Sequence, residues 1–147
     1  MTQKFTTPCF VRKNTPKLRK KLEELGYKLN NGKAWGRFLV TFRIEETNEW
    51  KYVASPAWDL QNNPDIDVSI DCGTNEDLFL AIAALREDSD YMQFFTDGTE
   101  FILCDRYDWV DMYSVLCSGL SNAKDRVKEL DKFQKATAEE LIEHFKN

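Results

Sequence analysis

One pattern occurs twice in this chain: a short apolar segment leads into a capped helix, and a β-hairpin follows the helix. Thr15 and Asn75 occupy the matching cap positions. The apolar residues after each cap share one helical spacing, namely Leu18, Leu22 and Leu25 in the first copy and Leu78, Ile82 and Leu85 in the second. Such a stripe after a polar cap predicts a helix with one buried face. We therefore predict two β-α-β-β units.

Local signals place the elements of the first unit. A strand is expected at residues 10–11, and Pro16 and Gly26 mark the two ends of the following helix. The sequence Asn30-Asn31-Gly32 predicts the turn of a hairpin, because Asn and Gly tolerate positive φ angles, and residues 35–44 supply the returning strand. The core face of that strand is expected to carry Phe38, Val40, Phe42 and Ile44.

The second unit has equally local signals. Residues 65–72 alternate strictly between polar and apolar side chains, which is typical of a half-buried strand with an acidic outer face. A helix follows Asn75, with Glu76 and Asp77 in its first turn, where negative charge favours the helix dipole. Asp97-Gly98 then predicts a hairpin that joins residues 91–96 to residues 100–105.

The remaining residues favour helices. Trp109, Met112, Tyr113 and Leu116 recur at helical spacing, a second helical pattern covers residues 123–133, and Thr137 with Glu140 forms a capping-box sequence. We predict an α+β fold in which two β-α-β-β units form one mixed, mainly antiparallel sheet with the helices on one face. A single domain is expected over residues 1–147, with units at 1–44 and 66–105 and a helical C-terminal region at 106–147.

Composition limits the class of protein. No apolar stretch approaches the roughly 20 residues that a membrane span needs. The four cysteines contain no Cys-x-x-Cys pair, which favours reduced thiols in a cytoplasmic protein. Charge is divided unevenly: residues 1–33 carry nine basic and two acidic side chains, whereas residues 44–111 carry seventeen acidic and three basic ones. The two regions either attract each other within the fold or face different partners.

Association with a protein is the function that the sequence favours, either with an unidentified partner or between copies of the chain. The candidates for an interface are the large rings of Trp50, Trp58 and Trp109, because tryptophan often dominates interfaces. Trp58 stands between Pro56 and Pro64 in the longest expected loop. The alternative for each ring is that it fills core or covers a sheet edge.

Nucleic-acid binding is the main alternative. Its candidates are the basic residues at the first strand–helix junction, namely Arg12, Lys13, Lys17, Arg19, Lys20 and Lys21. Such a patch is more often a solvated helix face, and the isoelectric point of about 5.0 disfavours this function. The acidic middle instead suggests a mimic of nucleic acid, built from Asp65, Asp67 and Asp71 with Glu45, Glu46 and Glu49.

Catalytic signals are weak, and we predict no catalytic residue, metal site or cofactor. His144 is the single imidazole, and the thiols lack the spacing of structural zinc ligands. Asp105, Asp108 and Asp111 recur every three residues and offer oxygen ligands to Mg²⁺ or Ca²⁺, but such spacing is usually solvated surface. Gly73 lies between a predicted strand and a predicted helix, where a glycine usually forms a turn. The alternative is that an anion binds at the N-terminus of that helix.

Two segments carry a resemblance to a known group of proteins. Residues 8–16 read PCFVRKNTP, residues 22–27 read LEELGY, and residues 70–86 read IDCGTNEDLFLAIAALR. Over about residues 5–112 the chain resembles small proteins of phages and mobile elements of gut bacteria, a family with no established activity. The resemblance implies an intracellular accessory protein and carries over no functional residues.

Overall fold

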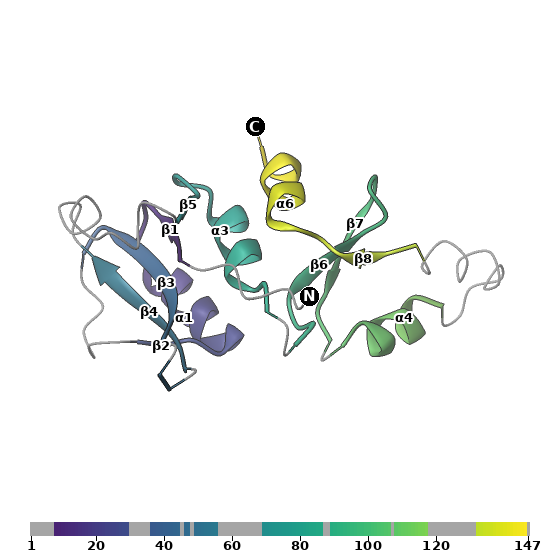
Figure 1. Cartoon of the computed structure of the whole chain (residues 1–147), viewed down its shortest axis with the longest axis horizontal. Helices are drawn as coiled ribbons and strands as arrows, with labels where there is room; N and C mark the ends of the chain where they lie inside the picture. The colour runs from purple at the N-terminus through teal and green to yellow at the C-terminus, as the bar shows by residue number, and fades with distance from the viewer. Residues whose placement is uncertain are drawn as a thin grey trace. The chain divides into compact units, whose positions relative to one another are not determined.

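The protein divides into two compact units, which we call the N-terminal unit (Phe5–Ala83) and the C-terminal unit (Ala84–Lys146). The computed structural model describes residues 8–29, 36–44, 46–47, 49–55, 69–86, 89–106, 108–117 and 132–146 (Figure 1). The predicted α+β class is confirmed. The predicted single sheet is wrong, because the described strands form one sheet of five strands and another of three.

The described residues of the N-terminal unit form a mixed sheet and two helices. Its elements are β1 (Cys9–Val11), α1 (Pro16–Leu25), β2 (Lys28–Leu29), β3 (Phe38–Ile44), β4 (Glu49–Ser55), β5 (Ile70–Asp71) and α3 (Glu76–Ala83). The strand order is β2-β4-β3-β1-β5. β3 pairs antiparallel with β1 and with β4, whereas β5 pairs parallel with β1 and β2 pairs parallel with β4.

The strand after α1 does not form the predicted hairpin with β3. It pairs instead with β4, with Lys28 opposite Lys51 and Leu29 opposite Tyr52. Both edges of β3 are already occupied, by β1 on one side and by β4 on the other, so the open edge of β4 is what remains for β2. The predicted turn at residues 30–32 lies outside the described residues.

The predicted second repeat is divided between the two units. β5 pairs with β1, with Cys9 opposite Ile70, so β5 joins the first sheet. α3 also belongs to the N-terminal unit, whereas the hairpin that follows it belongs to the C-terminal unit. The boundary between the two units therefore lies after Ala83 and not at the predicted ends of the repeats. Parallel pairing of β5 with β1 satisfies the backbone groups on one edge of β1, which a separate second repeat would leave unpaired. Residues 65–68 of the predicted strand lie outside the described residues.

Both predicted helix caps are confirmed. The Thr15 side chain accepts the N–H of Leu18, and Asn75 accepts the N–H of Leu78 in the same way. Gly26 ends α1 in the left-handed conformation, with φ at 108°. α3 ends at Ala83, two residues before the last apolar position of the predicted stripe.

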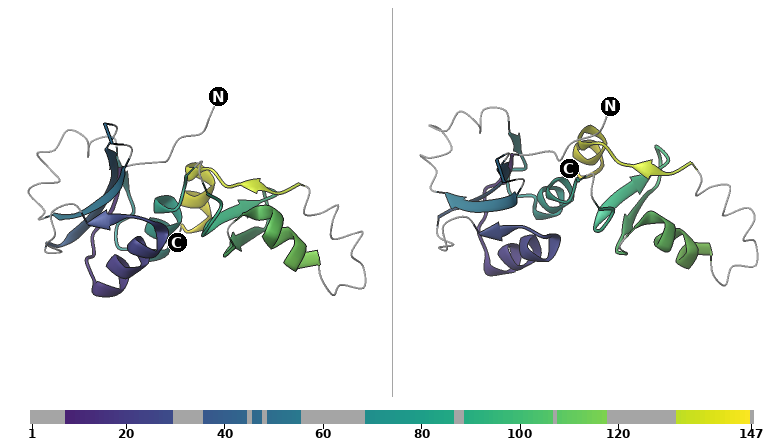
Figure 2. Two further views of the ribbon diagram at one scale, coloured as in Figure 1. Left: turned by 90° about the horizontal axis from the view of Figure 1, so that it is seen from below. Right: turned by 60° about the horizontal axis from the view of Figure 1, so that its bottom comes forward.

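The core of the N-terminal unit differs from the prediction. Leu39 and Thr41 are fully buried on the face that α1 and α3 cover (Figure 2), while Phe38 and Val40 are buried in a second cluster on the opposite face. The prediction placed Thr41 outside the core. Its hydroxyl is satisfied inside the protein by the Sγ of Cys9, 2.8 Å away, so burial leaves no polar group unpaired there.

The C-terminal unit contains β6 (Gln93–Thr96), β7 (Phe101–Cys104), α4 (Trp109–Cys117), β8 (Gln134–Lys135) and α6 (Ala138–His144). The strands are antiparallel in the order β7-β6-β8. The Asp97-Gly98 hairpin and the capping box of Thr137 and Glu140 are confirmed. The sequence did not predict β8, and residues 118–131 lie outside the described part of the chain.

Candidate interaction surfaces

The predicted basic cluster is partly used inside the N-terminal unit. Arg12 pairs with Asp71 at 2.6 Å, and Lys13 pairs with Glu76 at 2.8 Å. These pairs connect the β1–α1 junction to the β5–α3 junction. The Arg12 guanidinium also lies 5.5 Å from the centre of the Phe10 ring, so its position is fixed by an ion pair and by a ring.

The other basic candidates lie on α1. Arg19 donates to the side-chain oxygen of Asn14 at 2.5 Å, while Lys17, Lys20 and Lys21 are exposed. The hydrogen bond from Lys13 and the charges of Lys13, Lys17 and Lys21 lower the pKa of Glu76. The exposed lysines therefore share a neighbourhood with the acidic start of α3, which reduces the positive field that they offer to a polyanion.

The acidic candidates are also scattered. Asp71 is bound to Arg12; partial burial acts to raise its pKa, but Arg12 and the N–H of Gly73 together lower it below its usual value. Glu49 pairs with Lys51 at 3.4 Å, and Glu46 is exposed in the β3–β4 turn. The remaining residues proposed for a nucleic-acid mimic, Glu45, Asp65 and Asp67, lie outside the described residues.

The three tryptophan candidates have different surroundings. Trp50 is half-buried on β4, directly opposite Arg43, whose guanidinium lies 5.4 Å from the ring centre. Trp109 stacks on Phe95 with 4.3 Å between ring centres and packs on the core of the C-terminal unit. Trp58 lies outside the described residues. The core packing of Trp109 agrees with the alternative that the sequence left open for it.

A set of aromatic residues that the sequence did not single out meets where α6 covers the β6–β7 hairpin. The imidazole of His144 stacks on Phe101 with 4.0 Å between ring centres, and Phe145 meets Phe94 edge to face at 5.4 Å. Phe94 and Phe101 share one face of the hairpin, and Phe95 points to the opposite face. We call His144, Phe145, Phe94 and Phe101, together with Ile142 of the same helix α6, the α6–hairpin surface.

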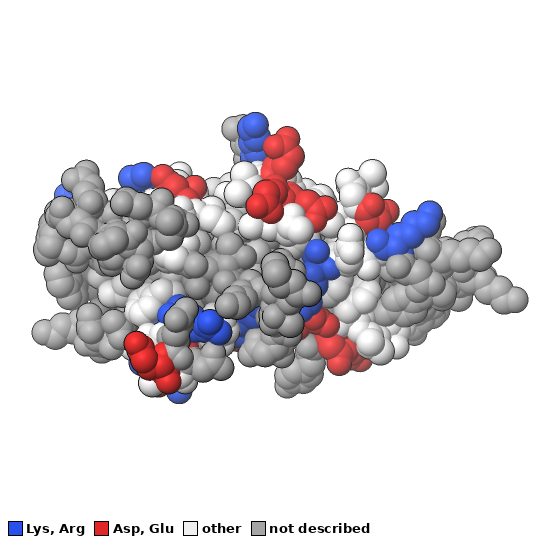
Figure 3. Space-filling model, in the orientation of Figure 1, with Lys and Arg blue, Asp and Glu red and all other residues white. Residues whose placement is uncertain are grey.

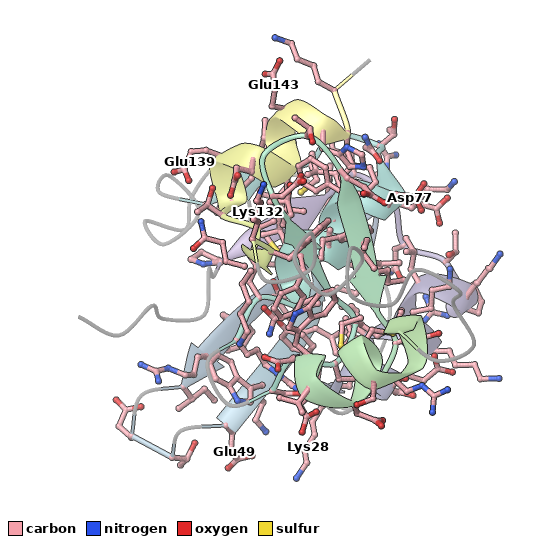
Figure 4. All side chains as sticks on the ribbon, turned by 90° about the vertical axis from the view of Figure 1, so that its right-hand side faces the viewer. Lys28, Glu49, Asp77, Lys132, Glu139 and Glu143 are labelled. Carbon is pink, nitrogen blue, oxygen red and sulfur yellow. The ribbon has the colours of Figure 1, made fainter. Side chains whose placement is uncertain are left out.

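The α6–hairpin surface is open to solvent at its helical side. Ile142 is 39% exposed, and His144 is also exposed although it lies flat on Phe101. Acidic side chains gather over α6 in the view of Figure 3, and Glu139 and Glu143 project outward from this helix in Figure 4. The surface therefore combines exposed apolar and aromatic groups with negative charge around them.

Comparisons with known proteins give no relative for this chain. No family model, curated protein or solved structure matches it. Within the part of the chain that the structure describes, no helix is long and apolar enough to cross a membrane.

Three thiols are buried: Cys9 in β1, Cys104 in β7 and Cys72 directly after β5. Burial raises the pKa of Cys9 to about 12, against a smaller lowering by its contact with Thr41. Burial also raises the pKa of Cys72 and that of Cys104. Because the thiolate is the reactive form of cysteine, these three residues are poor nucleophiles in the folded protein.

Of the three aspartates at positions 105, 108 and 111, Asp108 stabilises the start of α4. Asp108 accepts the N–H of Asp111 at 2.8 Å and so caps the first turn of α4, and Asp105 is exposed. Asp90, from before β6, accepts the N–H of Trp109 at the same helix end. The described residues include no group of three or more His, Cys, Asp or Glu side chains arranged to hold a metal ion.

The sequence could not indicate the α6–hairpin surface because its members are far apart in the chain. His144 and Phe101 come from different elements, and an isolated imidazole before a phenylalanine has no distinctive spacing. The one available signal was that Phe101 and Phe94 lie on the same face of a strongly predicted hairpin.

Proposed function

We propose that this protein is a non-enzymatic accessory protein of phage or mobile-element type, which acts in the cytoplasm by binding another protein. The observation that carries the proposal is that α6 exposes both Ile142 and the imidazole of His144, which stacks on Phe101. Apolar and aromatic groups kept at a surface and surrounded by charge are typical of interfaces. We assign the contact to the α6–hairpin surface.

The state of the thiols supports a binding role over a catalytic one. Cys9 and Cys72 have raised pKa values and lie buried in the N-terminal unit, and the hydroxyl of Thr41 is engaged with Cys9. A nucleophilic enzyme needs an accessible, activated group with a base beside it. The single imidazole of the chain is instead stacked among phenylalanine rings in the C-terminal unit.

The ion pairs support a protein partner over nucleic acid. Arg12 and Lys13 are each bound to a carboxylate, so a phosphate would have to displace that carboxylate before binding. The three exposed lysines of α1 remain available as phosphate contacts. The loss of Arg12 and Lys13 to ion pairs weakens this candidate interface, because affinity for nucleic acid rests largely on phosphate neutralisation.

Quantitative affinity capture with matched variants tests this proposal. The Ile142→Asp variant places a charge within the surface, and Glu46→Gln, in the exposed β3–β4 turn of the N-terminal unit, is the control. We expect a defined protein to be retained by the wild type and by Glu46→Gln and lost with Ile142→Asp, with circular dichroism showing that all three remain folded. An identical bound set for all three would contradict the assignment to this surface.

A further inference from the structure

The outer edge of β7 offers backbone groups for a further strand. β7 lies at the edge of the sheet β7-β6-β8, and among the described strands none pairs with its outer side. In an antiparallel pair, alternate residues direct both N–H and C=O away from the partner strand. Such an edge is a template on which another extended chain can pair.

The residues of β7 do not protect this edge. The strand reads Phe-Ile-Leu-Cys from Phe101 to Cys104, with no lysine, proline or charged residue. Natural proteins usually block an edge with such residues or by keeping it very short. The opposite edge of the sheet is protected in both ways. β8 has only two residues, and one of them is Lys135, which pairs with Asp90 at 2.8 Å.

The two ends of β7 are negatively charged. Residues 97–108 contain four carboxylates and one guanidinium, which gives a net charge of −3. Asp105 and Asp108 are exposed at one end. Asp97, at the hairpin turn near the other end, accepts the N–H groups of Glu100 and Thr99, which lower its pKa to about 2 and keep it ionised at neutral pH.

We propose that β7 binds an extended, apolar segment of another protein that is flanked by lysine or arginine, as an additional strand of the sheet. The proposal rests on the proposed function and specifies its partner. An added strand would continue the sheet face on which His144 lies over Phe101, so it would adjoin the α6–hairpin surface. A second copy of the chain fits poorly, because either orientation of two β7 strands brings acidic ends together.

A peptide selection tests the proposal directly. The probe is a decapeptide library with central positions drawn from Val, Ile, Thr, Tyr and Phe and two lysines at each end, compared with the same library flanked by glutamates. We expect the lysine-flanked library to be enriched about tenfold over the other, because a few surface charge pairs together reach that ratio. Hydrogen exchange should then slow at residues 101–104 in the complex.

Two controls separate strand addition from unspecific binding. N-methyl groups on alternate residues of the selected peptide, on the edge that faces β7, should abolish binding, whereas methylation of the other edge should not. Asp105→Lys should reduce the preference for lysine flanks. Glu46→Lys, which makes the same charge change in the exposed turn of the N-terminal unit, should leave the preference unaltered.

The outcomes distinguish this proposal from the broader one. Enrichment of neither library, equal enrichment of both, or slowed exchange confined to α6 would overturn strand addition. A dimer of the free chain in sedimentation with slowed exchange at residues 101–104 would overturn it in favour of self-pairing. A third outcome is that Ile142→Asp abolishes capture of a protein whereas N-methylation of the peptide has no effect. That result would support protein binding at the α6–hairpin surface and would overturn only strand addition to β7.

Discussion

Both units join distant charged residues in pairs, but they differ in the apolar side chains that they expose. In the N-terminal unit, basic and acidic residues distant in sequence are joined in pairs, as with Arg12 and Asp71. In the C-terminal unit, apolar side chains remain at the surface, where Val110 is 74% and Ile142 39% exposed. The comparison supports our proposal that the C-terminal unit provides the surface for a partner.

The units also differ in how much structure supports each strand. The five-stranded sheet is covered by two of the described helices, α1 and α3, whose residues Leu22, Phe79 and Ile82 are fully buried. The three-stranded sheet has one edge strand of two residues and another with an open edge among the described residues. We therefore expect the C-terminal unit to open at a lower free energy than the N-terminal unit.

The largest effect should come from a cavity in the stronger unit. Leu22 is fully buried on α1, and Leu22→Ala should cost about 2–5 kcal/mol of unfolding free energy. Hydrogen exchange followed by mass spectrometry should show faster exchange in β1 and α3 and unchanged exchange in β6 and β7. The exposed Lys20→Ala on the same helix is the control. Equal acceleration in both units would mean that they unfold together and would remove the comparison.

Thiol labelling gives a second measure of the difference. Cys9, Cys72 and Cys104 are all buried, so alkylation requires local opening. We expect Cys104 to be alkylated faster than Cys9 and Cys72. Its rate should exceed theirs by a factor of about ten for each 1.4 kcal/mol by which the free energy of opening is lower in the C-terminal unit. Site-resolved mass spectrometry measures the three rates. Earlier labelling of Cys9 would reverse the proposed order of stability.

The capping box tests how α6 is held on the hairpin. The Thr137 hydroxyl accepts the N–H of Glu140 at 3.2 Å, and the Glu140 carboxylate accepts the N–H of Thr137 at 2.9 Å. Thr137→Ala should cost about 1 kcal/mol and speed exchange within α6, whereas Thr137→Ser retains the oxygen and should have little effect. Unchanged exchange in Thr137→Ala would show that ring packing alone holds the helix.

A smaller effect is expected from the ion pairs of the N-terminal unit. Because the folded pKa values of Asp71 and Glu76 lie below their usual values, the pairs stabilise the fold at neutral pH, and this contribution is lost as pH falls through the lowered values. Both pairs are well exposed, so each contributes at most about 1 kcal/mol. Asp71→Asn combined with Glu76→Gln should flatten the dependence of urea unfolding on acid pH, and Glu46→Gln should not.

The smallest effect should follow removal of the exposed lysines of α1. Replacing Lys17, Lys20 and Lys21 by alanine should change the unfolding free energy by no more than about 0.5 kcal/mol each, because these residues are exposed surface. A titration of the wild type with duplex DNA at low ionic strength should show no binding that weakens with added salt. Binding with a steep salt dependence, lost in the triple variant, would assign a function to the N-terminal unit as well.

The sequence predicted the features that depend on neighbouring residues. Thr15 and Gly26 bound α1, and Asp97-Gly98 forms its hairpin, because capping and turn chemistry act over a few residues. The pairing of β2 with β4 was not predictable in this way, since it depends on which strand edges are already occupied. A local sequence pattern does not show which strands compete for the same edge.

The interaction surfaces were predictable only in part for the same reason. Arg12 lies 59 residues from Asp71, and no spacing rule joins them. Trp109 was recognised as a large ring, but its stacking on Phe95 requires the hairpin and α4 to be in place. His144 stands out in the sequence only as the single imidazole, and its stacking on Phe101 requires α6 to lie on the hairpin.

The parallel pairing of β1 with β5 has a consequence for how the protein is made. The partner of Cys9 in this ladder is Ile70, so a ribosome must translate most of the N-terminal unit before its first strand acquires that neighbour. α1 and the β3–β4 hairpin can form early from local contacts, whereas closure of the sheet waits for distant residues. A nascent chain that pauses before residue 70 would leave one side of β1 unpaired and available to chaperones.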